Sequence, residues 1–290
     1  MFGLLVAVRP MYLGGGLLLF VIGLTMADGP LRIVPAALGL FVVALVHVIT
    51  HYVNDAEDVA TDDLSAPTGL TGGSRAIQRG LVTATTLLRV SAGLAVVVCV
   101  IAAIEMAMGE FVAASLHLAI LLFGYAYSGR PFMLGRRGLS EFDAALVMGF
   151  LVPLAGADAG GNINAAAWAT SGVLFVETIF ARLCTAYPDL DADRATDKRT
   201  VPAMVGRRGT IVVFVIVGMV IAVAGFFAAP WLPLPSWQYA RALVVAAFAM
   251  LCAFAIATRF ADEHRVTLPV LGVLGYACSQ GGLLAAALVR

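Results

Sequence analysis

The sequence has few charged residues and almost no lysine. Only 12% of its 290 residues are charged, against roughly 25% in ordinary soluble domains, and Lys198 is the one lysine. The four cysteines stand singly in apolar segments, without the paired spacing of a zinc site or a redox motif. No linker-like stretch divides the chain. These absences argue against a soluble domain, thiol chemistry, structural zinc and a multidomain chain.

Long apolar runs make up most of what is present. Hydrophobic residues account for 61% of the chain and the mean hydropathy is +0.96. A helix needs about 20 apolar residues to cross a bilayer core. We therefore predict an all-α polytopic membrane protein with nine transmembrane helices. The predicted spans are residues 11–27, 33–53, 83–104, 111–128, 142–157, 166–186, 210–229, 239–258 and 267–288.

The basic residues are distributed unevenly about these spans. All 18 fall on or near one side except Arg32, Arg241 and Arg290. Because lysine and arginine concentrate in cytoplasmic loops, we expect a multi-pass protein of the cell (inner) membrane. Its N-terminus and the loops after spans two, four, six and eight are expected in the cytoplasm. Apolar residues precede Arg9, which is the wrong order for a cleaved signal peptide, so we expect the N-terminal segment to be retained.

Acidic residues are concentrated in two of these cytoplasmic loops. On a helix, residues four apart share a face, so Asp58 with Asp62, and Asp189 with Asp193, can each present two carboxylates to one point. Asp55 lies on the same side as the first pair. Opposed carboxylate pairs repel unless cations lie between them, and oxygen ligands without His or Cys favour Mg²⁺. Nine of the 18 acidic residues lie there, namely Asp55, Glu57, Asp58, Asp62, Asp63, Asp189, Asp191, Asp193 and Asp197.

The pattern predicts magnesium holding a diphosphate, because Mg²⁺ usually completes its coordination with substrate phosphates. The alternative interpretation is a pair of solvated acidic caps. Basic side chains beside each cluster favour the phosphate site, since guanidinium groups grip phosphate oxygens at two points. Lys198, one helical turn beyond Arg194, suits a phosphate oxygen as well. These neighbours are Arg75 and Arg79 after the first cluster and Arg194, Lys198 and Arg199 after the second.

Three further features are less specific. The run Thr71-Gly72-Gly73-Ser74-Arg75 allows a tight turn with exposed backbone N–H groups, a plausible anion nest. Tyr127, after span four, is either an anchor at the membrane boundary or a ring that stabilises a cationic centre. Glu177 is the one acid deep inside a predicted span, where a functional role is the default interpretation. It either lines the cavity or is protonated and bonded to Ser or Thr.

The aspartate motifs resemble those of the UbiA superfamily of intramembrane prenyltransferases. Asn54-Asp55-x-x-Asp58-x-x-x-Asp62 is similar to the first motif of that family, NDxxDxxxD, and Asp189-x-x-x-Asp193 to its second, DxxxD. The nine spans, with motifs after spans two and six, agree with it. Further motifs resemble the branch of the menaquinone-pathway naphthoate prenyltransferases, namely Thr71-Gly72-Gly73-Ser74-Arg75, Tyr127-Ser128-Gly129-Arg130-Pro131, Arg137-Gly138-Leu139-Ser140-Glu141 and Asp193-Arg194-x-x-x-Lys198-Arg199-Thr200.

The resemblance implies a single domain over residues 1–290, with two helical bundles around a central cavity. The expected repeat halves are about 1–138 and 139–265, followed by a last helix at 266–290. It also implies Mg²⁺ on the motif aspartates, a prenyl diphosphate between the loops, and Tyr127 beside the reacting carbon. The implied metal ligands are Asp55, Asp58, Asp62, Asp189 and Asp193, and the implied substrate-binding residues are Asn54, Arg75, Arg130, Arg194, Lys198 and Arg199.

Three functions remain open at this stage. The first is transfer of a prenyl group from an isoprenoid diphosphate to an aromatic or quinone-precursor acceptor within the bilayer. The second is cyclisation of the diphosphate to a terpene, favoured by departures from the naphthoate branch at His51, Thr185, Ala186 and Asp197. The third is a transporter or cation channel, which would place acids along a path inside the spans. We expect no nucleic-acid partner, and the sequence leaves the oligomeric state open.

Overall fold

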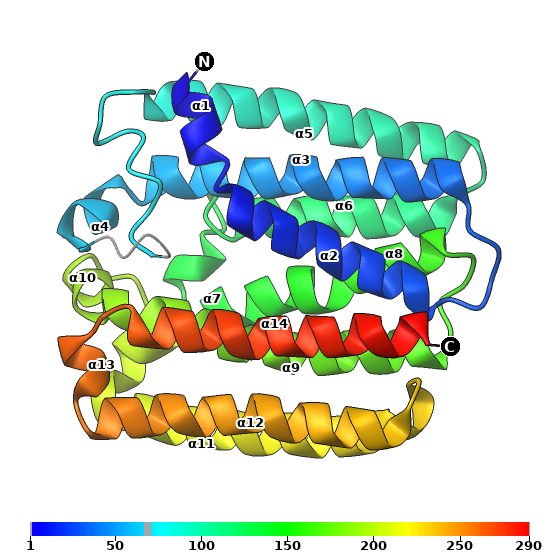
Figure 1. Cartoon of the computed structure of the whole chain (residues 1–290). Coiled ribbons are helices and arrows are strands. Elements are labelled where there is room, and N and C mark those ends of the chain that lie inside the picture. Colours follow the sequence, from blue (N-terminus) through cyan, green and yellow to red (C-terminus); the bar gives the residue numbers. More distant parts are fainter. Residues whose placement is uncertain (1, 67–70, 290) are drawn as a thin grey trace.

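The computed structural model describes residues 2–66 and 71–289, and within these ranges the chain is helical and contains no strand. Long, roughly parallel helices make up most of the described chain (Figure 1). The helices are α1 (Phe2–Ala7), α2 (Pro10–Met26), α3 (Ile33–Glu57), α4 (Val59–Leu64), α5 (Ala84–Ala107), α6 (Phe111–Ala126), α7 (Ser140–Ala144), α8 (Val152–Ala159), α9 (Ala165–Ala186), α10 (Leu190–Ala195), α11 (Val201–Ala228), α12 (Pro235–Ala257), α13 (Phe260–Glu263) and α14 (Thr267–Leu288). A π-helical turn, Ala145–Leu151, joins α7 to α8.

The described residues contain seven helical segments that are long and apolar enough to cross a membrane. The remaining two predicted spans correspond to α2 and α6, which are apolar but have only 17 and 16 residues. The all-helical multi-pass membrane fold is therefore confirmed, whereas the count of nine spans is not. Helices α1 and α14 end at opposite ends of the bundle (Figure 1).

Local sequence signals mark several helix starts. Asn164 caps α9, where its side chain accepts a hydrogen bond from the backbone N–H of Ala167 at 2.9 Å. Thr83 caps α5 in the same way through Thr86. Proline stands in the first turn of α2, α11 and α12, where its missing N–H costs no helical hydrogen bond.

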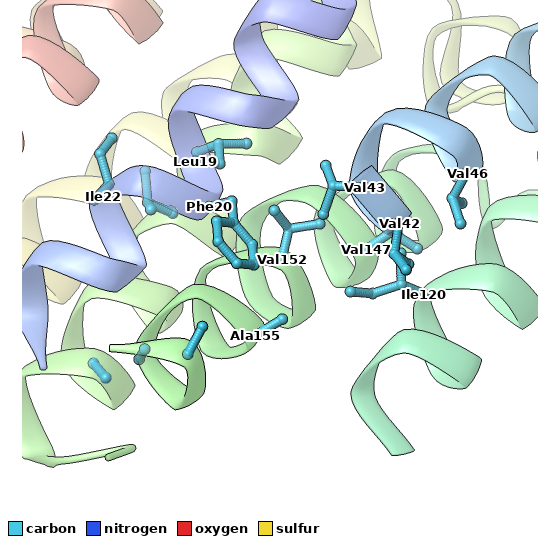
Figure 2. Packing of buried hydrophobic residues seen from close by; sticks show 14 of the residues in the cluster. Leu19, Phe20, Ile22, Val42, Val43, Val46, Ile120, Val147, Val152 and Ala155 are labelled. Carbon is cyan, nitrogen blue, oxygen red and sulfur yellow. The ribbon is translucent and has the colours of Figure 1, made fainter. Parts of the chain in front are cut away.

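The buried apolar residues form two main clusters. The first joins α2, α3, α5, α6 and α8 with the start of α9, and the second joins the end of α9 with α11, α12 and α14. In Figure 2, side chains of the first cluster meet between α2, α3 and the segment that leads into α8. Helix α9 contributes to both clusters and so connects the two groups of helices.

Helices α2 and α8 approach each other through glycines. A Cβ atom on Gly23 would collide with the backbone of Pro153, and one on Gly156 would collide with the backbone of Phe20. Small residues allow such close helix contacts in membranes, where van der Waals packing drives helix association.

We expect Gly156→Ala to lower the melting temperature in detergent by several degrees, because the added methyl group must separate two backbones that cannot yield. The matched control is Gly172→Ala in α9, where an added Cβ meets no neighbouring atom within 4 Å. The control is expected to leave the melting temperature unchanged or slightly higher, since alanine favours helix. Equal melting temperatures for the two variants would contradict this account of the α2–α8 contact.

Candidate active site

The two acidic segments meet at one end of the helical bundle. Asp58 ends α3 and begins the short helix α4, while Asp189 precedes α10, and α4 and α10 lie side by side (Figure 1). Their contact includes a hydrogen bond of 2.8 Å between the hydroxyl groups of Thr61 and Thr196. Residues separated by more than a hundred positions are thereby brought to one place.

Lys198 connects the two acidic motifs. Its Nζ donates to Asp58 Oδ2 at 2.7 Å and lies 4.0 Å from Asp193 Oδ1. Asp58 also accepts from Arg136 Nη2 at 3.0 Å and from Asn54 Nδ2 at 2.7 Å. Both aspartates are buried, so the cations hold carboxylates that would otherwise repel one another in a poorly hydrated site.

These contacts control the ionisation of Asp58 and Lys198. Burial alone would raise the pKa of Asp58, but the charges of Lys198 and Arg136 and their hydrogen bonds outweigh it and hold the pKa below its usual value. Burial would likewise lower the pKa of Lys198, yet Asp58 and Asp193 raise it instead. The pair is therefore fully charged at neutral pH.

Asp62 is in a different environment. Its pKa is raised to about 7, chiefly by burial and also by the neighbouring charges of Asp55 and Asp58, against the lowering effect of Arg9 and Lys198. Gly73 packs directly against this carboxylate, with φ of +74°, and a side chain at that position would overlap Asp62. The glycine-rich turn thus folds over the acidic site, as its sequence position suggested.

Asp55, the first aspartate of the motif, is held by partners outside the cavity. Its carboxylate forms an ion pair with Arg9 and accepts a hydrogen bond from the Ser74 hydroxyl. Asp55 does not line the cavity that receives Asp58 and Asp62. In this structure it ties α3 to the start of α2 and to the glycine-rich turn.

The other four motif aspartates line a cavity of about 210 Å³ that extends between the helices. One end of the cavity is polar, and its walls include Asn54, Asp58, Asp62, Asp189, Asp193 and Lys198. The other end is mostly apolar, with Val43, Val46, Ile120, Val147, Met148 and Val152. Figure 2 shows several of these apolar side chains converging from α3, α6 and the segment before α8. The cavity therefore suits a molecule with a strongly charged head and an apolar body.

Tyr127 lies on the cavity wall between these two ends. Its hydroxyl accepts a hydrogen bond from Arg182 Nη2 at 2.6 Å and lies 3.0 Å from Ser140 Oγ. The Arg182 guanidinium carbon is 5.7 Å from the centre of the tyrosine ring. Tyr127 is thus fixed within the cavity, which favours the second of its two predicted roles.

Four of the predicted substrate-binding residues lie elsewhere. Arg130, Arg194 and Arg199 are exposed and do not line the cavity. Arg130 bonds Glu57 at 3.0 Å, and Arg194 donates to the carbonyl of Ala203 at 2.7 Å. Arg75 lines a neighbouring depression with Arg9 and Arg79, and donates to the carbonyl of Ser65.

Glu177 also lies outside the cavity. Arg241 of α12 donates to it at 2.7 Å, and the Ser279 hydroxyl of α14 accepts a hydrogen bond from Arg241 and donates one to the Glu177 carboxylate. The three side chains are almost completely buried. Glu177 therefore joins α9, α12 and α14, and neither of the interpretations made from the sequence, a cavity lining or a neutral hydrogen-bonded acid, included this arginine partner.

The described residues contain no ready-made group of three or more His, Cys, Asp or Glu side chains arranged around a metal. The oxygen donors nevertheless fit a hard divalent cation. Burial is the main cause of the raised pKa of Asp62, and the neighbouring charges of Asp55 and Asp58 add to it. Oδ1 of Asp189 is buried and has no hydrogen-bond partner within the described part of the chain. A cation in the cavity would stabilise the ionised form of Asp62 and supply a partner for this oxygen of Asp189.

Several cavity residues could not be selected from sequence spacing. Arg136 and Arg182 contribute charge to the site, and His47 and His51 line its wall. The only sequence signal for Arg182 is a cation inside an apolar run, and for the two histidines their separation of four residues before the first acidic motif. Asp143, which also lines the cavity, is an acid at the start of the fifth predicted span.

Comparison with known proteins defines the class. Residues 16–269 match the model of the UbiA prenyltransferase family. Because the match covers most of the chain, the protein belongs to this family, as the resemblance of its motifs indicated. A search of the curated proteins gives no match.

Solved structures show the same fold. A UbiA homologue from Archaeoglobus fulgidus bound to GPP and Mg²⁺ superposes with a TM-score of 0.68 at 15% identity, covering 98% of this chain and 99% of that one. An apo UbiA homologue from Aeropyrum pernix K1 gives a TM-score of 0.70 at 15% identity, with coverage of 95% and 98%. A structure described for digeranylgeranylglyceryl phosphate synthase in membranes gives 0.67 at 15% identity, with full coverage of both chains.

Proposed function

We propose that the protein transfers a prenyl group from an isoprenoid diphosphate to an aromatic or quinone-precursor acceptor, releasing diphosphate inside the membrane. The observation that carries this proposal is the contact of Lys198 with both acidic motifs at the charged end of a cavity that continues between apolar side chains. A prenyl diphosphate has the same division into a charged head and an apolar tail. The solved homologue that holds GPP and Mg²⁺ supports the choice of substrate and cofactor.

The proposed chemistry is ionisation of an allylic C–O bond, whose electron pair leaves with the diphosphate. Lys198 lines the cavity and is placed to bind the departing phosphate oxygens, and Arg136, paired with Asp58, adds positive charge beside the site where negative charge develops. Magnesium, held by Asp58, Asp62, Asp189 and Asp193, would neutralise the leaving diphosphate. Asp55 is assigned a supporting part, because its carboxylate orders Arg9 and Ser74.

The apolar part of the cavity wall is proposed to protect the allylic cation that remains after diphosphate leaves. Val43, Val46 and Val147 limit the water that would capture an allylic cation. The Tyr127 ring, fixed by Arg182 and Ser140, presents aromatic surface to the reacting carbon. An electron-rich acceptor ring then forms the new C–C bond and loses one proton.

The test is turnover of purified protein with geranylgeranyl diphosphate, Mg²⁺ and a set of hydroxylated benzoates and naphthoates, followed by mass spectrometry of the products. We expect an acceptor-dependent prenylated product and release of diphosphate, both abolished by a chelator and restored by Mg²⁺. Diphosphate release that is unaffected by chelation would refute the metal-dependent mechanism.

Terpene cyclisation is the second candidate. His51, Thr185 and Ala186, which depart from the naphthoate branch, all line the cavity, where an acceptor would be recognised. Abundant cyclic hydrocarbon or alcohol formed from geranylgeranyl diphosphate and Mg²⁺ without acceptor would replace the first proposal with this one. A product that requires the acceptor would exclude it.

The polar end of the cavity is proposed to face the cytoplasm of the cell (inner) membrane. The distribution of arginines supports this orientation. Reporter fusions after residues 64 and 109, at opposite ends of the bundle, test it. A cytoplasmic signal is expected only from the first.

A further inference from the structure

Asp143 is a buried acid that the proposed diphosphate site does not use. It lies on α7, near the start of a membrane-spanning segment, and is 2% exposed. It lines the same cavity as the aspartate motifs. Within the described part of the chain neither of its two carboxylate oxygens has a hydrogen-bond partner. A buried carboxyl group without a partner costs free energy, so Asp143 lowers the stability of the folded protein.

The local backbone explains how Asp143 faces the cavity. Directly after α7 the helix becomes π-helical over Ala145–Leu151. A π-helix has more residues per turn than an α-helix, and such turns are frequent at functional sites. Asp143 and Val147 are four residues apart and share a face of a helix. Val152 lies five residues beyond Val147, a spacing that a regular α-helix turns to a different face but that a π-helical turn keeps on the same side. All three side chains line the cavity.

A second polar atom in the same cavity also lacks a partner. Nε2 of His47, on α3, is buried and has no hydrogen-bond partner in the described residues. Val43, Val46 and Ile120 line the cavity together with these two polar groups. This cavity therefore combines apolar side chains with an oxygen acceptor on α7 and an imidazole nitrogen on α3, both without a partner among the described residues. Further polar residues also line it, namely Thr50, His51 and Arg182.

We propose that Asp143 accepts a hydrogen bond from a hydroxyl group of the prenyl acceptor, and so selects hydroxylated aromatic rings and orients them in the cavity. The inference rests on the proposed function and names the acceptor class for that site. A flat ring fits between the valines, and its O–H group supplies the donor that Asp143 lacks. His47 is the second polar contact available to such a ring. A site that hydrogen-bonds a substrate hydroxyl rejects analogues without it, because its buried polar group is left unpaired.

The experiment compares 1-naphthol with 1-methoxynaphthalene, in which a methyl group replaces the hydroxyl hydrogen and so removes the donor, using geranylgeranyl diphosphate and Mg²⁺. The wild-type protein is expected to prefer naphthol by more than about 100-fold in kcat/KM. Asp143→Leu should reduce that preference to less than about tenfold, with an unchanged KM for the diphosphate. Asp158→Asn, in the same span and bonded to Arg32 near its other end, is the control and should keep the preference.

A stability measurement separates this role from a structural one. Without substrates, Asp143→Asn and Asp143→Leu should melt at a higher temperature than the wild type, because each removes or neutralises an unpaired buried carboxylate. A structural acid would give lower melting temperatures, and that result overturns the inference. The inference is also overturned if Asp143→Leu still turns over and keeps the wild-type preference for naphthol. That result would leave the prenyltransferase proposal unaffected. If the wild type turns over the diphosphate but prenylates no hydroxylated ring, both proposals fall together.

Discussion

Lys198→Ala is expected to reduce kcat/KM for the prenyl diphosphate by at least about 100-fold, which is the usual effect of removing one preorganised charge-stabilising donor. Lys198 bonds Asp58 at 2.7 Å and lies 4.0 Å from Asp193. Its loss removes a phosphate contact and also leaves two acidic motifs facing each other with less compensating charge. Binding of the substrate should therefore suffer more than folding, because Arg136 still pairs with Asp58.

The measurement is steady-state turnover together with binding of Mg²⁺ and geranylgeranyl diphosphate to the purified variant. The control is Arg208→Ala, an exposed arginine of α11 on the same side of the bundle, which should turn over normally. Lys198→Arg keeps the charge and should recover part of the activity. Normal turnover by Lys198→Ala would show that Lys198 has no essential role in the proposed site. If neither Lys198→Ala nor Lys198→Arg folds, the lysine is structural.

The acidic motifs were predictable because their signal is local. Asp58 and Asp62, or Asp189 and Asp193, are four residues apart, and this spacing places each pair on one side of a short helical segment. Hydropathy likewise predicted the helices, since apolar length is a property of a single segment. It predicted the two short ones less well, because α2 and α6 end before reaching about 20 residues.

The choice among arginines was not predictable. Sequence proximity to the second motif selected Arg194 and Arg199, and the family resemblance implied Arg130, but all three are exposed. Arg136 reaches Asp58, 78 positions away, and Arg182 enters the cavity from α9. Which of many cations near one membrane face reaches inward depends on helix rotation and tertiary packing, and a single sequence does not contain that information in its local spacing.

The role of each acidic residue inside the spans was likewise not predictable from the sequence alone. For Glu177 the sequence left a cavity lining and a protonated acid bonded to Ser or Thr as alternatives, because charge within a membrane is costly. In the structure that cost is offset by Arg241, 64 residues further along the chain. Asp143 has no such partner within the described residues and does line the cavity. The difference between a structural and a functional intramembrane acid therefore lies in its tertiary partners.

Asp62→Asn is expected to abolish turnover, to below about one hundredth of the wild-type rate, and to remove this residue's contribution to the pH dependence of stability. The pKa of Asp62 is raised by burial from 3.8 to about 7 in the folded protein. Between these values the folded state binds more protons than the unfolded state, so this residue's contribution to stability falls as pH rises from about 4 to about 7. Without divalent cations, Asp62→Asn should therefore be more stable than the wild type at about pH 8, and the difference should shrink on acidification.

Magnesium should act in the opposite direction, because it binds the ionised carboxylate. We expect Mg²⁺ to raise the melting temperature of the wild type more at about pH 8 than at about pH 5.5, and to have much less effect on Asp62→Asn. Asp63→Asn is the matched control, since Asp63 is adjacent but exposed, and it should behave as the wild type in all of these measurements. A magnesium effect of equal size in Asp62→Asn and the wild type would show that the cation binds without Asp62. The first acidic motif would then have to act through Asp58 alone. The carboxylate of Asp58 is already held by Lys198 and Arg136.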